Sequence, residues 1–276
     1  MSLVNQIAEL IRDTSSSLPE DVVATLKKSF QSEVPDSSAA VILQTILDNV
    51  ALAEKQQTPL CQDTGTLTFF VNKHLRERVT DDVIRQATAL ATEKGWLRRN
   101  CFDSITGASY DNNCADGAPL VHTCEAAGVT LLLKGGGSEN MSRQYSLPDS
   151  TLGAGRDLAG VRACLLDAVT KAQGYGCAPG ILGVCIGGDR ATGYEIAKEQ
   201  LLRKLGDPSP DPTIAALEKS ILAEANTLGI GPMGLGGKTT LLGVQIAARP
   251  RLPASFFVTV AYMCWALRRK TLLLGD

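Results

Sequence analysis

The chain has 276 residues, of which 44% are hydrophobic and 20% are charged, and its formal net charge is -2. This is the composition of an ordinary globular protein with enough apolar residues for a sizeable core. The near-neutral charge and the lack of a long basic run give no electrostatic signature of nucleic-acid binding. No apolar stretch approaches the roughly 20 residues of a membrane-spanning helix, and the amphipathic N-terminus lacks the pattern of a signal peptide. We therefore expect a cytoplasmic protein with neither a membrane nor a nucleic-acid partner.

The first part of the chain, up to about residue 57, is predicted to be helical because its apolar residues recur at helical spacing. Pro19 and the two acidic residues after it suit the start of the second helix. The inward faces of the three expected helices are Leu3, Val4, Ile7, Leu10 and Ile11, then Val22, Val23, Leu26 and Phe30, and then, within residues 37–54, Val41, Ile42, Ile46 and Val50.

From about residue 58 onward, short β-branched and aromatic runs alternate with helical patterns. The expected helices are 81–93, 158–172, 189–205 and 211–228. The expected strands are 66–71, 119–124, 129–133, 181–186, 241–247 and 256–262. The sequence thus predicts a mixed α/β (α+β) fold, in which a helical part is followed by a mixed sheet with helices over residues 58–276. Because no internal repeat and no long linker occurs, residues 1–276 are expected to form a single domain.

Three of the eight cysteines lie in segments that suit ligation better than packing, and none belongs to a Cys-x-x-Cys pair. Cys61 lies in Pro-Leu-Cys-Gln-Asp-Thr-Gly, Cys177 in Gly-Tyr-Gly-Cys-Ala-Pro-Gly, and Cys264 in Met-Cys-Trp-Ala-Leu-Arg-Arg. Three separate thiolates can hold three irons of a [4Fe–4S] cluster and leave the fourth iron open as a Lewis acid. This pattern indicates hydration or dehydration of a small acid, with zinc binding by the same cysteines as an alternative. Three further cysteines sit in apolar segments and are expected in the core: Cys124, Cys164 and Cys185.

Two glycine-rich loops, 134–140 and 229–240, offer backbone amides that can bind an anionic oxygen. The second loop contains Gly-Lys-Thr at 237–239, but a phosphate-binding P-loop requires a glycine where this chain has Pro232. A P-loop also follows a strand, whereas a helix is expected upstream of this loop. A nucleotide-binding transferase is therefore a weak alternative, and a carboxylate suits these amides as well as a phosphate does.

Histidine is scarce, so a histidine-based triad or zinc site has little support. His74 lies in a charged, surface-like stretch, and His122 fits a structural position on a strand. A general base must therefore be another group. Asp63, two residues after Cys61, is the best candidate carboxylate. The basic run 268–270, just after the last loop cysteine, can receive a dicarboxylate, and the pair 98–99 is similar.

These motifs together resemble the class I (iron–sulfur) fumarases and the related L-tartrate dehydratases. The similarity is to their N-terminal domain, which is the alpha subunit in two-subunit members, and it extends over about residues 59–270. Four segments match in order: Cys-Gln-Asp-Thr-Gly at 61–65, Lys-Gly-Gly-Gly-Ser-Glu-Asn at 134–140, Gly-Pro-Met-Gly-Leu-Gly-Gly at 231–237 and Cys-Trp-Ala-Leu-Arg-Arg at 264–269.

The resemblance implies a cofactor, a reaction and a set of site residues. In the family, the cysteines that match Cys61, Cys177 and Cys264 hold a [4Fe–4S] cluster, whose unligated iron binds the substrate. The implied reaction is the reversible hydration or dehydration of a C4 dicarboxylate such as fumarate/malate or tartrate. The implied substrate contacts are Gln62, Asp63 (also the candidate acid/base), Arg98, Gly135, Gly136, Gly137 and Ser138.

The resemblance also implies partners. Family members need a beta part that supplies further catalytic groups, and this chain ends at Asp276, soon after the last motif. We therefore expect a separate beta subunit, a dimer of alpha or alpha–beta units, and no activity of the chain alone.

Three motifs depart from the family pattern. Leu252 replaces the active-site histidine of the usual Arg-His-Pro-Ala-Ser motif, and leucine can neither bind the substrate nor carry a proton. The second ligand motif reads Cys-Ala-Pro at 177–179 in place of Cys-Pro-Pro, and Asn-Cys-Ala-Asp at 113–116 replaces Asn-Thr-Gly-Asp. The alternative is therefore a homologue that keeps the fold but is non-catalytic or acts on an altered substrate.

Overall fold

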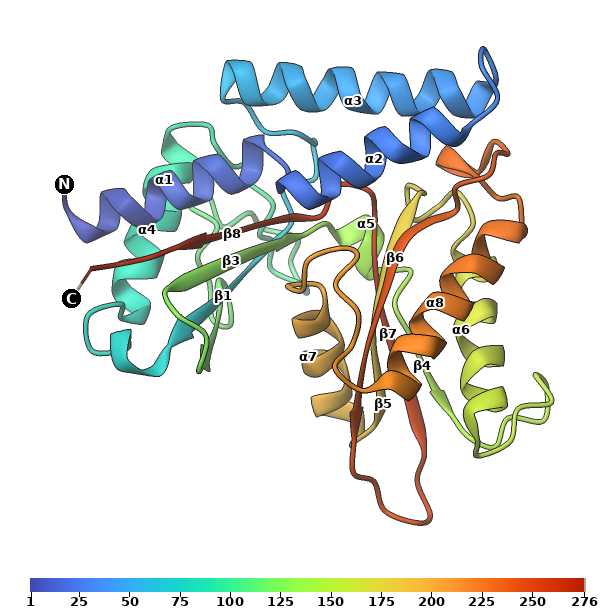
Figure 1. Cartoon of the computed structure of the whole chain (residues 1–276). Helices are drawn as coiled ribbons and strands as arrows, with labels where there is room; N and C mark the ends of the chain where they lie inside the picture. Colours follow the sequence, from blue (N-terminus) through green and yellow to red (C-terminus); the bar gives the residue numbers. More distant parts are fainter. Residues whose placement is uncertain (276) are drawn as a thin grey trace. The chain divides into compact units, whose positions relative to one another are not determined.

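The computed structural model describes residues 1–275, which form helices and two mixed four-stranded sheets (Figure 1). This confirms the predicted α/β class. The residues group into two compact units: unit 1 comprises residues 1–19, 48–136 and the segment from 266 on, and unit 2 comprises 20–47 and 137–265. That the two units act as a single domain stays a prediction.

Unit 1 is built on a sheet with the strand order β2–β1–β3–β8. β1 is parallel to β2 and antiparallel to β3, which pairs antiparallel with β8. Alternate residues of β1 and β3 face the same side, where Phe69, Leu131 and Leu133 share a core with Ile7 of α1 and Ile84 of α4. The elements are α1 (Leu3–Ser16), β1 (Thr66–Asn72), η1 (Lys73–Leu75), α4 (Asp81–Glu93), β2 (Leu120–Cys124), β3 (Val129–Lys134) and β8 (Arg268–Leu272).

Unit 2 has its own sheet, with the strand order β4–β7–β5–β6. β5 is buried throughout and pairs parallel with β6 and antiparallel with β7. α6 and α8 pack on one face of this sheet with Leu182, Val184 and Ile186. α7 packs on the other face, where a side chain at Gly183 would collide with the Ala197 carbonyl. The elements are α2 (Glu20–Ser32), β4 (Arg143–Ser146), α6 (Leu158–Ala172), β5 (Gly180–Gly187), α7 (Arg190–Gln200), α8 (Pro212–Thr227), η2 (Pro232–Gly234), β6 (Leu241–Arg249) and β7 (Phe257–Met263).

Two helices have residues in both units, α3 (Ser38–Gln56) and the short α5 (Gly136–Glu139). α3 confirms the third expected helix, but Val41 is 59% exposed and not inward as predicted. The sequence around it is apolar on several sides, so its spacing does not single out one face.

The structure corrects three further expectations. α7 ends at Gln200 instead of continuing to 205, because the chain turns there and Arg203 binds the buried Glu218 at 2.7 Å. β4 and β8 were not predicted. Cys164 and Cys185 are buried as expected, and burial raises the pKa of both thiols to about 11, but Cys124 is only half-buried.

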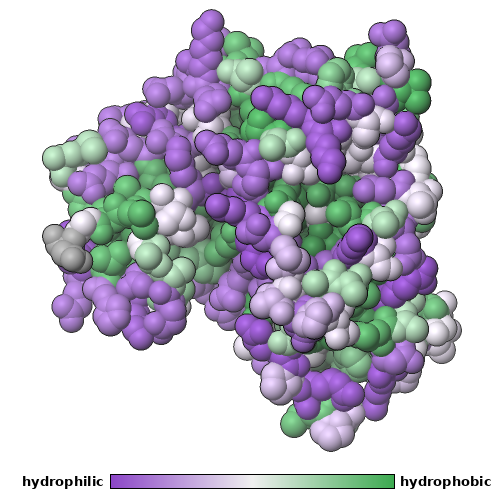
Figure 2. Space-filling view, in the orientation of Figure 1, coloured by the Kyte–Doolittle hydropathy of each residue, from purple (hydrophilic) through white to green (hydrophobic). Residues whose placement is uncertain are grey.

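Figure 2 shows hydrophilic side chains over most of the visible face, with smaller apolar areas between them. Among residues 1–275, no helix combines the length and the apolar character required to cross a membrane.

Candidate functional site

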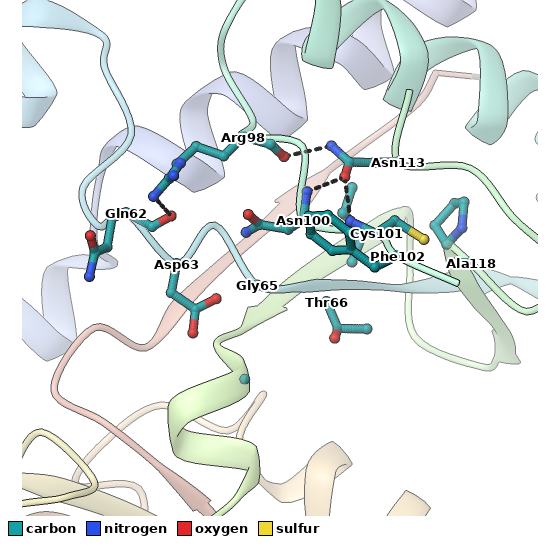
Figure 3. Close-up of a pocket in the computed structure, with 13 residues that line it drawn as sticks. Gln62, Asp63, Gly65, Thr66, Arg98, Asn100, Cys101, Phe102, Asn113 and Ala118 are labelled. Atoms are coloured by element: carbon teal, nitrogen blue, oxygen red, sulfur yellow. Dashed lines mark hydrogen bonds between the residues drawn. The ribbon is translucent and has the colours of Figure 1, made fainter. Parts of the chain in front are cut away.

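A cavity of about 490 Å³ in unit 1 brings together several of the predicted site residues (Figure 3). Four of them line it: Gln62, Asp63, Arg98 and Gly136. The remaining lining residues are Gly65, Thr66, Leu67, Asn100, Cys101, Phe102, Asn113, Ala118 and Pro119. Its size is typical of a site for a small molecule.

The loop that carries Gln62 and Asp63 is tied down at both ends. Before it, the Leu60 amide donates to the Ser15 carbonyl at 2.8 Å. After it, Gly65 has φ +84°, and a Cβ there would lie 2.8 Å from the carbonyl carbon and oxygen of Lys134. Glycine is therefore required at this position, both for its backbone conformation and for the close approach of β3.

Asp63 lies directly against the glycine loop that follows β3. A Cβ on Gly135 would be 2.8 Å from Asp63 Oδ2 and 3.1 Å from its carboxylate carbon. The bare backbone of Gly135 therefore leaves the space that the carboxylate occupies. This contact joins two segments that were predicted to share the site.

Arg98 is positioned by a residue whose role the sequence analysis missed. Its Nη1 donates to the Gln62 carbonyl at 3.2 Å, and its own carbonyl accepts from Asn113 Nδ2 at 2.7 Å (Figure 3). Asn113 Oδ1 also accepts from the amides of Asn100 (2.8 Å) and Cys101 (3.1 Å). The buried Asn113 thus fixes the whole cavity wall from 98 to 101.

The basic run 268–270 forms the start of β8. Arg268 is 1% exposed, and its Nη2 donates to the Asp63 carbonyl at 2.9 Å. Because its guanidinium is inaccessible, Arg268 cannot receive a dicarboxylate from solvent as the sequence suggested.

Two of the three candidate ligand cysteines are neighbours in unit 2. The amide of Trp265, next to Cys264, donates to the Cys177 carbonyl at 3.4 Å. Cys177 is exposed and Cys264 is half-buried. The buried ring of Tyr262 packs against Gly176, where a side chain would collide with it, so glycine beside Cys177 has a packing function.

The remaining candidates are divided between the two units. Cys61 is a half-buried free thiol in unit 1. Gly137 and Ser138 belong to unit 2, and neither lines the cavity of unit 1. The buried Ser138 donates its hydroxyl to Met263 Sδ at 3.7 Å.

The described residues hold no preformed site for a single metal ion. Within residues 1–275, no three His, Cys, Asp or Glu side chains converge on a point where one metal ion would be held. None of the eight cysteines forms a disulfide, and a [4Fe–4S] cluster takes one thiolate per ligated iron.

The second glycine-rich loop is already occupied by a carboxylate of the chain. The buried Glu33 accepts hydrogen bonds from the amides of Lys238 and Thr239, all at 2.9 Å. Lys238 Nζ donates to the Ser32 carbonyl at 2.8 Å. Because these donors are engaged, the loop does not offer them to a phosphate, which disfavours the nucleotide-binding alternative.

Neither histidine lies at the cavity. His74 is exposed, and His122 stacks on Phe70 with ring centroids 5.3 Å apart. Both positions agree with the surface and structural roles predicted.

Leu252 is 73% exposed in the turn between β6 and β7. Cys264 follows the opposite end of β7, which is roughly 20 Å away at the usual rise per residue. The departure at 252 is therefore remote from the Cys264 of the same chain.

Comparison with known proteins identifies relatives along nearly the whole chain. A sequence model of the fumarate hydratase (Fumerase) family matches residues 4–272. A putative class I fumarate hydratase from Geobacillus stearothermophilus is 46% identical over 97% of this chain, which spans only 54% of that protein.

Two alpha subunits match over nearly their full length. The putative L(+)-tartrate dehydratase subunit alpha of Methanocaldococcus jannaschii is 33% identical, over 98% of this chain and 96% of its own. The L(+)-tartrate dehydratase subunit alpha of Escherichia coli K12 is 30% identical, over 98% of this chain and 91% of its own. From the family match and these relatives, we conclude that the chain belongs to the fumarate hydratase (Fumerase) family.

Proposed function

We propose that the chain is the alpha component of a hydro-lyase that reversibly adds water to, or removes it from, a C4 dicarboxylate such as fumarate/malate or tartrate. The observation that carries this proposal is the cavity of unit 1, where Gln62, Asp63, Arg98 and Gly136 line one space. The names of the relatives, fumarate hydratase and L(+)-tartrate dehydratase, support the same reaction class.

The proposed cofactor is a [4Fe–4S] cluster held by Cys61, Cys177 and Cys264. Three observations support it: none of the three cysteines forms a disulfide, two of them are neighbours in unit 2, and the buried Arg268 has donor atoms without a partner. When bound, the cluster supplies a Lewis-acidic iron that polarises the C–O bond being made or broken.

The chain's own side chains would bind the substrate and move the proton. Arg98 at the cavity wall pairs with one substrate carboxylate, because a guanidinium matches a carboxylate in bidentate fashion. In the dehydration direction, the Asp63 carboxylate takes the proton from the carbon beside that carboxylate, and the hydroxyl leaves from the neighbouring carbon. In hydration, the Asp63 carboxyl returns the proton. Backbone amides of residues 135–138 are proposed to stabilise the negative charge that develops on the substrate.

The proposed assembly includes a second component. The relatives named subunit alpha support a beta subunit, and the Geobacillus stearothermophilus relative is about twice as long as this chain. We also propose a dimer of alpha or alpha–beta units and a cytoplasmic location.

A non-catalytic or altered-substrate homologue remains the second candidate, because Leu252 stands where the family has an active-site histidine. Leu252 and Cys264 lie at opposite ends of β7. If the active site is formed within one chain, the change at residue 252 is therefore weak support for this second candidate.

The first experiment is to measure iron and acid-labile sulfide in the chain after anaerobic reconstitution. We expect about four of each per chain, as a [4Fe–4S] cluster requires, with losses in Cys61→Ser, Cys177→Ser and Cys264→Ser. Cys101→Ser is the matched control, because Cys101 is half-buried, like Cys61 and Cys264, but is not a proposed ligand. Wild-type chain without iron and sulfide, or with zinc in their place, would contradict the cluster.

A further inference from the structure

Arg268 is a buried charge that the protein alone satisfies only in part. Its Nη2 donates to the Asp63 carbonyl, whereas Nε and Nη1 are buried without a hydrogen-bond partner. Within residues 1–275, Arg268 also forms no ion pair. Burying a charged group whose hydrogen-bond donors have no acceptor is strongly unfavourable. The Nε and Nη1 atoms of Arg268 therefore indicate an anionic partner that the polypeptide does not supply.

The position of Arg268 connects three site segments. Its hydrogen bond to Asp63 holds the loop that carries the first candidate ligand cysteine. In the sheet it pairs with Leu133, two residues before Gly135 of the glycine loop. Along the chain it follows Cys264 by four residues, and the three residues between them are buried.

A freely exchanging substrate does not fit this position. Arg268 is 1% exposed and does not line the cavity, whereas Arg98 is exposed and does. The missing partner is therefore expected to be a resident anion, and the proposed cluster with three cysteine thiolates carries a net negative charge.

We propose that Arg268 is the buried counter-cation of the iron–sulfur cluster. Its Nε and Nη1 donate to sulfur atoms of the cluster or of its cysteine ligands, while Nη2 fixes the Asp63 loop. This inference rests on the proposed function, because it requires the cluster. Hydrogen bonds to the sulfurs and a nearby cation stabilise the more negative, reduced form, so Arg268 raises the reduction potential.

The test uses the full chain reconstituted anaerobically, as wild type and as Arg268→Met, Arg268→Lys and Lys270→Met. Lys270→Met is the matched control, since it removes the same charge from the same face of β8 at an exposed position. Iron, sulfide and the reduction potential are measured for each.

We expect Arg268→Met to disfavour reduction at least tenfold relative to wild type, which is about 59 mV for one electron. Arg268→Lys keeps the charge but loses the planar guanidinium. Its reduction potential should lie between those of wild type and Arg268→Met. Lys270→Met should match wild type.

The outcomes separate this inference from the proposed function. Wild-type chain without a cluster overturns both. A full cluster with an unchanged potential in Arg268→Met overturns only the role of Arg268. If Arg268→Met fails to retain the cluster, the melting temperature of the cluster-free chain decides. An unchanged or higher value than wild type supports the inference, because an unpaired buried charge was removed, whereas a lower value shows a role in folding alone.

Discussion

Asp63 depends on the absence of a side chain at Gly135. The carboxylate occupies the space where a Cβ on Gly135 would lie, 2.8 Å from Oδ2. Because a carboxylate can rotate away, an added methyl group there should displace Asp63 without disturbing the backbone.

Gly135→Ala is therefore expected to lower kcat/KM by about 10²-fold, since a shift of about 1 Å in a catalytic group has an effect of that size. The melting temperature should stay close to wild type. Gly136→Ala provides the comparison, because its Cβ would lie 3.8 Å from the same oxygen, which is ordinary contact. Equal losses in the two variants would show that the crowding of Asp63 is not the cause. The assay uses the chain together with the proposed beta component.

Asp63→Asn tests the proton transfer itself. Asparagine keeps the backbone carbonyl that accepts from Arg268, so the loop should remain in place. We expect kcat to fall about 10²- to 10⁴-fold, the usual contribution of a general base, with a smaller change in KM. A variant that keeps wild-type kcat would assign the base to another residue.

At the scale of elements, the segment from 98 to 101 is held by Asn113 from the far side of its loop. The Asn113 side chain uses its full hydrogen-bonding capacity. Its oxygen accepts from two backbone amides, and its amide nitrogen donates to the Arg98 carbonyl and to Thr92 Oγ1, the latter at 2.9 Å. Arg98 therefore reaches the cavity from a wall that one residue organises.

Asn113→Asp keeps the two acceptor bonds but replaces the donors to Thr92 and the Arg98 carbonyl by an oxygen. We expect a rise in KM of about tenfold, with a smaller change in kcat, because one unsatisfied buried group costs about 1–3 kcal/mol and Arg98 binds rather than reacts. Thr92→Val removes only the acceptor of one Asn113 Nδ2 hydrogen bond, so we expect a smaller rise in KM. A fall in kcat at constant KM would contradict a positioning role for Asn113.

The sequence was informative about elements with local signals. The helices 81–93 and 158–172 were predicted at their observed bounds, since each has an apolar face and a capping residue, Thr80 or Asp157, just before it. β8 was missed because its Arg-Arg-Lys-Thr-Leu sequence does not resemble a strand, and pairing with β3 decides its conformation.

The same division applies to the site. The loop from 61 to 65 and the glycine loop could be singled out from the sequence because each is a short, contiguous motif, and their role in a site stays a prediction. The roles of Asn113 and Arg268 were not predictable, because their partners lie 12 to 21 and 205 residues away in the sequence. Their functions arise from tertiary contacts that no local pattern contains.

At the scale of the whole molecule, the chain covers different shares of its relatives. It spans 54% of the Geobacillus stearothermophilus protein but over 90% of the alpha subunits. The part of the longer relative outside the match is therefore a candidate substitute for the beta component.

We expect the reconstituted chain alone to show no turnover of fumarate, malate or tartrate. Adding the unmatched part of the Geobacillus stearothermophilus protein should produce activity with at least one of them, while adding it to the Cys264→Ser chain should not. Turnover by the single chain would show that a beta component is dispensable.

Leu252 tests whether activity depends on more than one copy of the chain. Because it is 73% exposed and roughly 20 Å along β7 from Cys264, we expect Leu252→His to leave cluster content and melting temperature unchanged. A histidine there cannot serve the Cys264 site of its own chain. If Leu252→His raises turnover, the histidine must therefore act at the Cys264 site of another copy of the chain. A Cys264→Ser/Leu252→His chain mixed with wild type in the presence of the beta component should then reproduce the gain. If the gain appears only when the Leu252→His change and Cys264 are in the same chain, residue 252 acts at the active site of its own chain. That result would contradict the separation seen along β7.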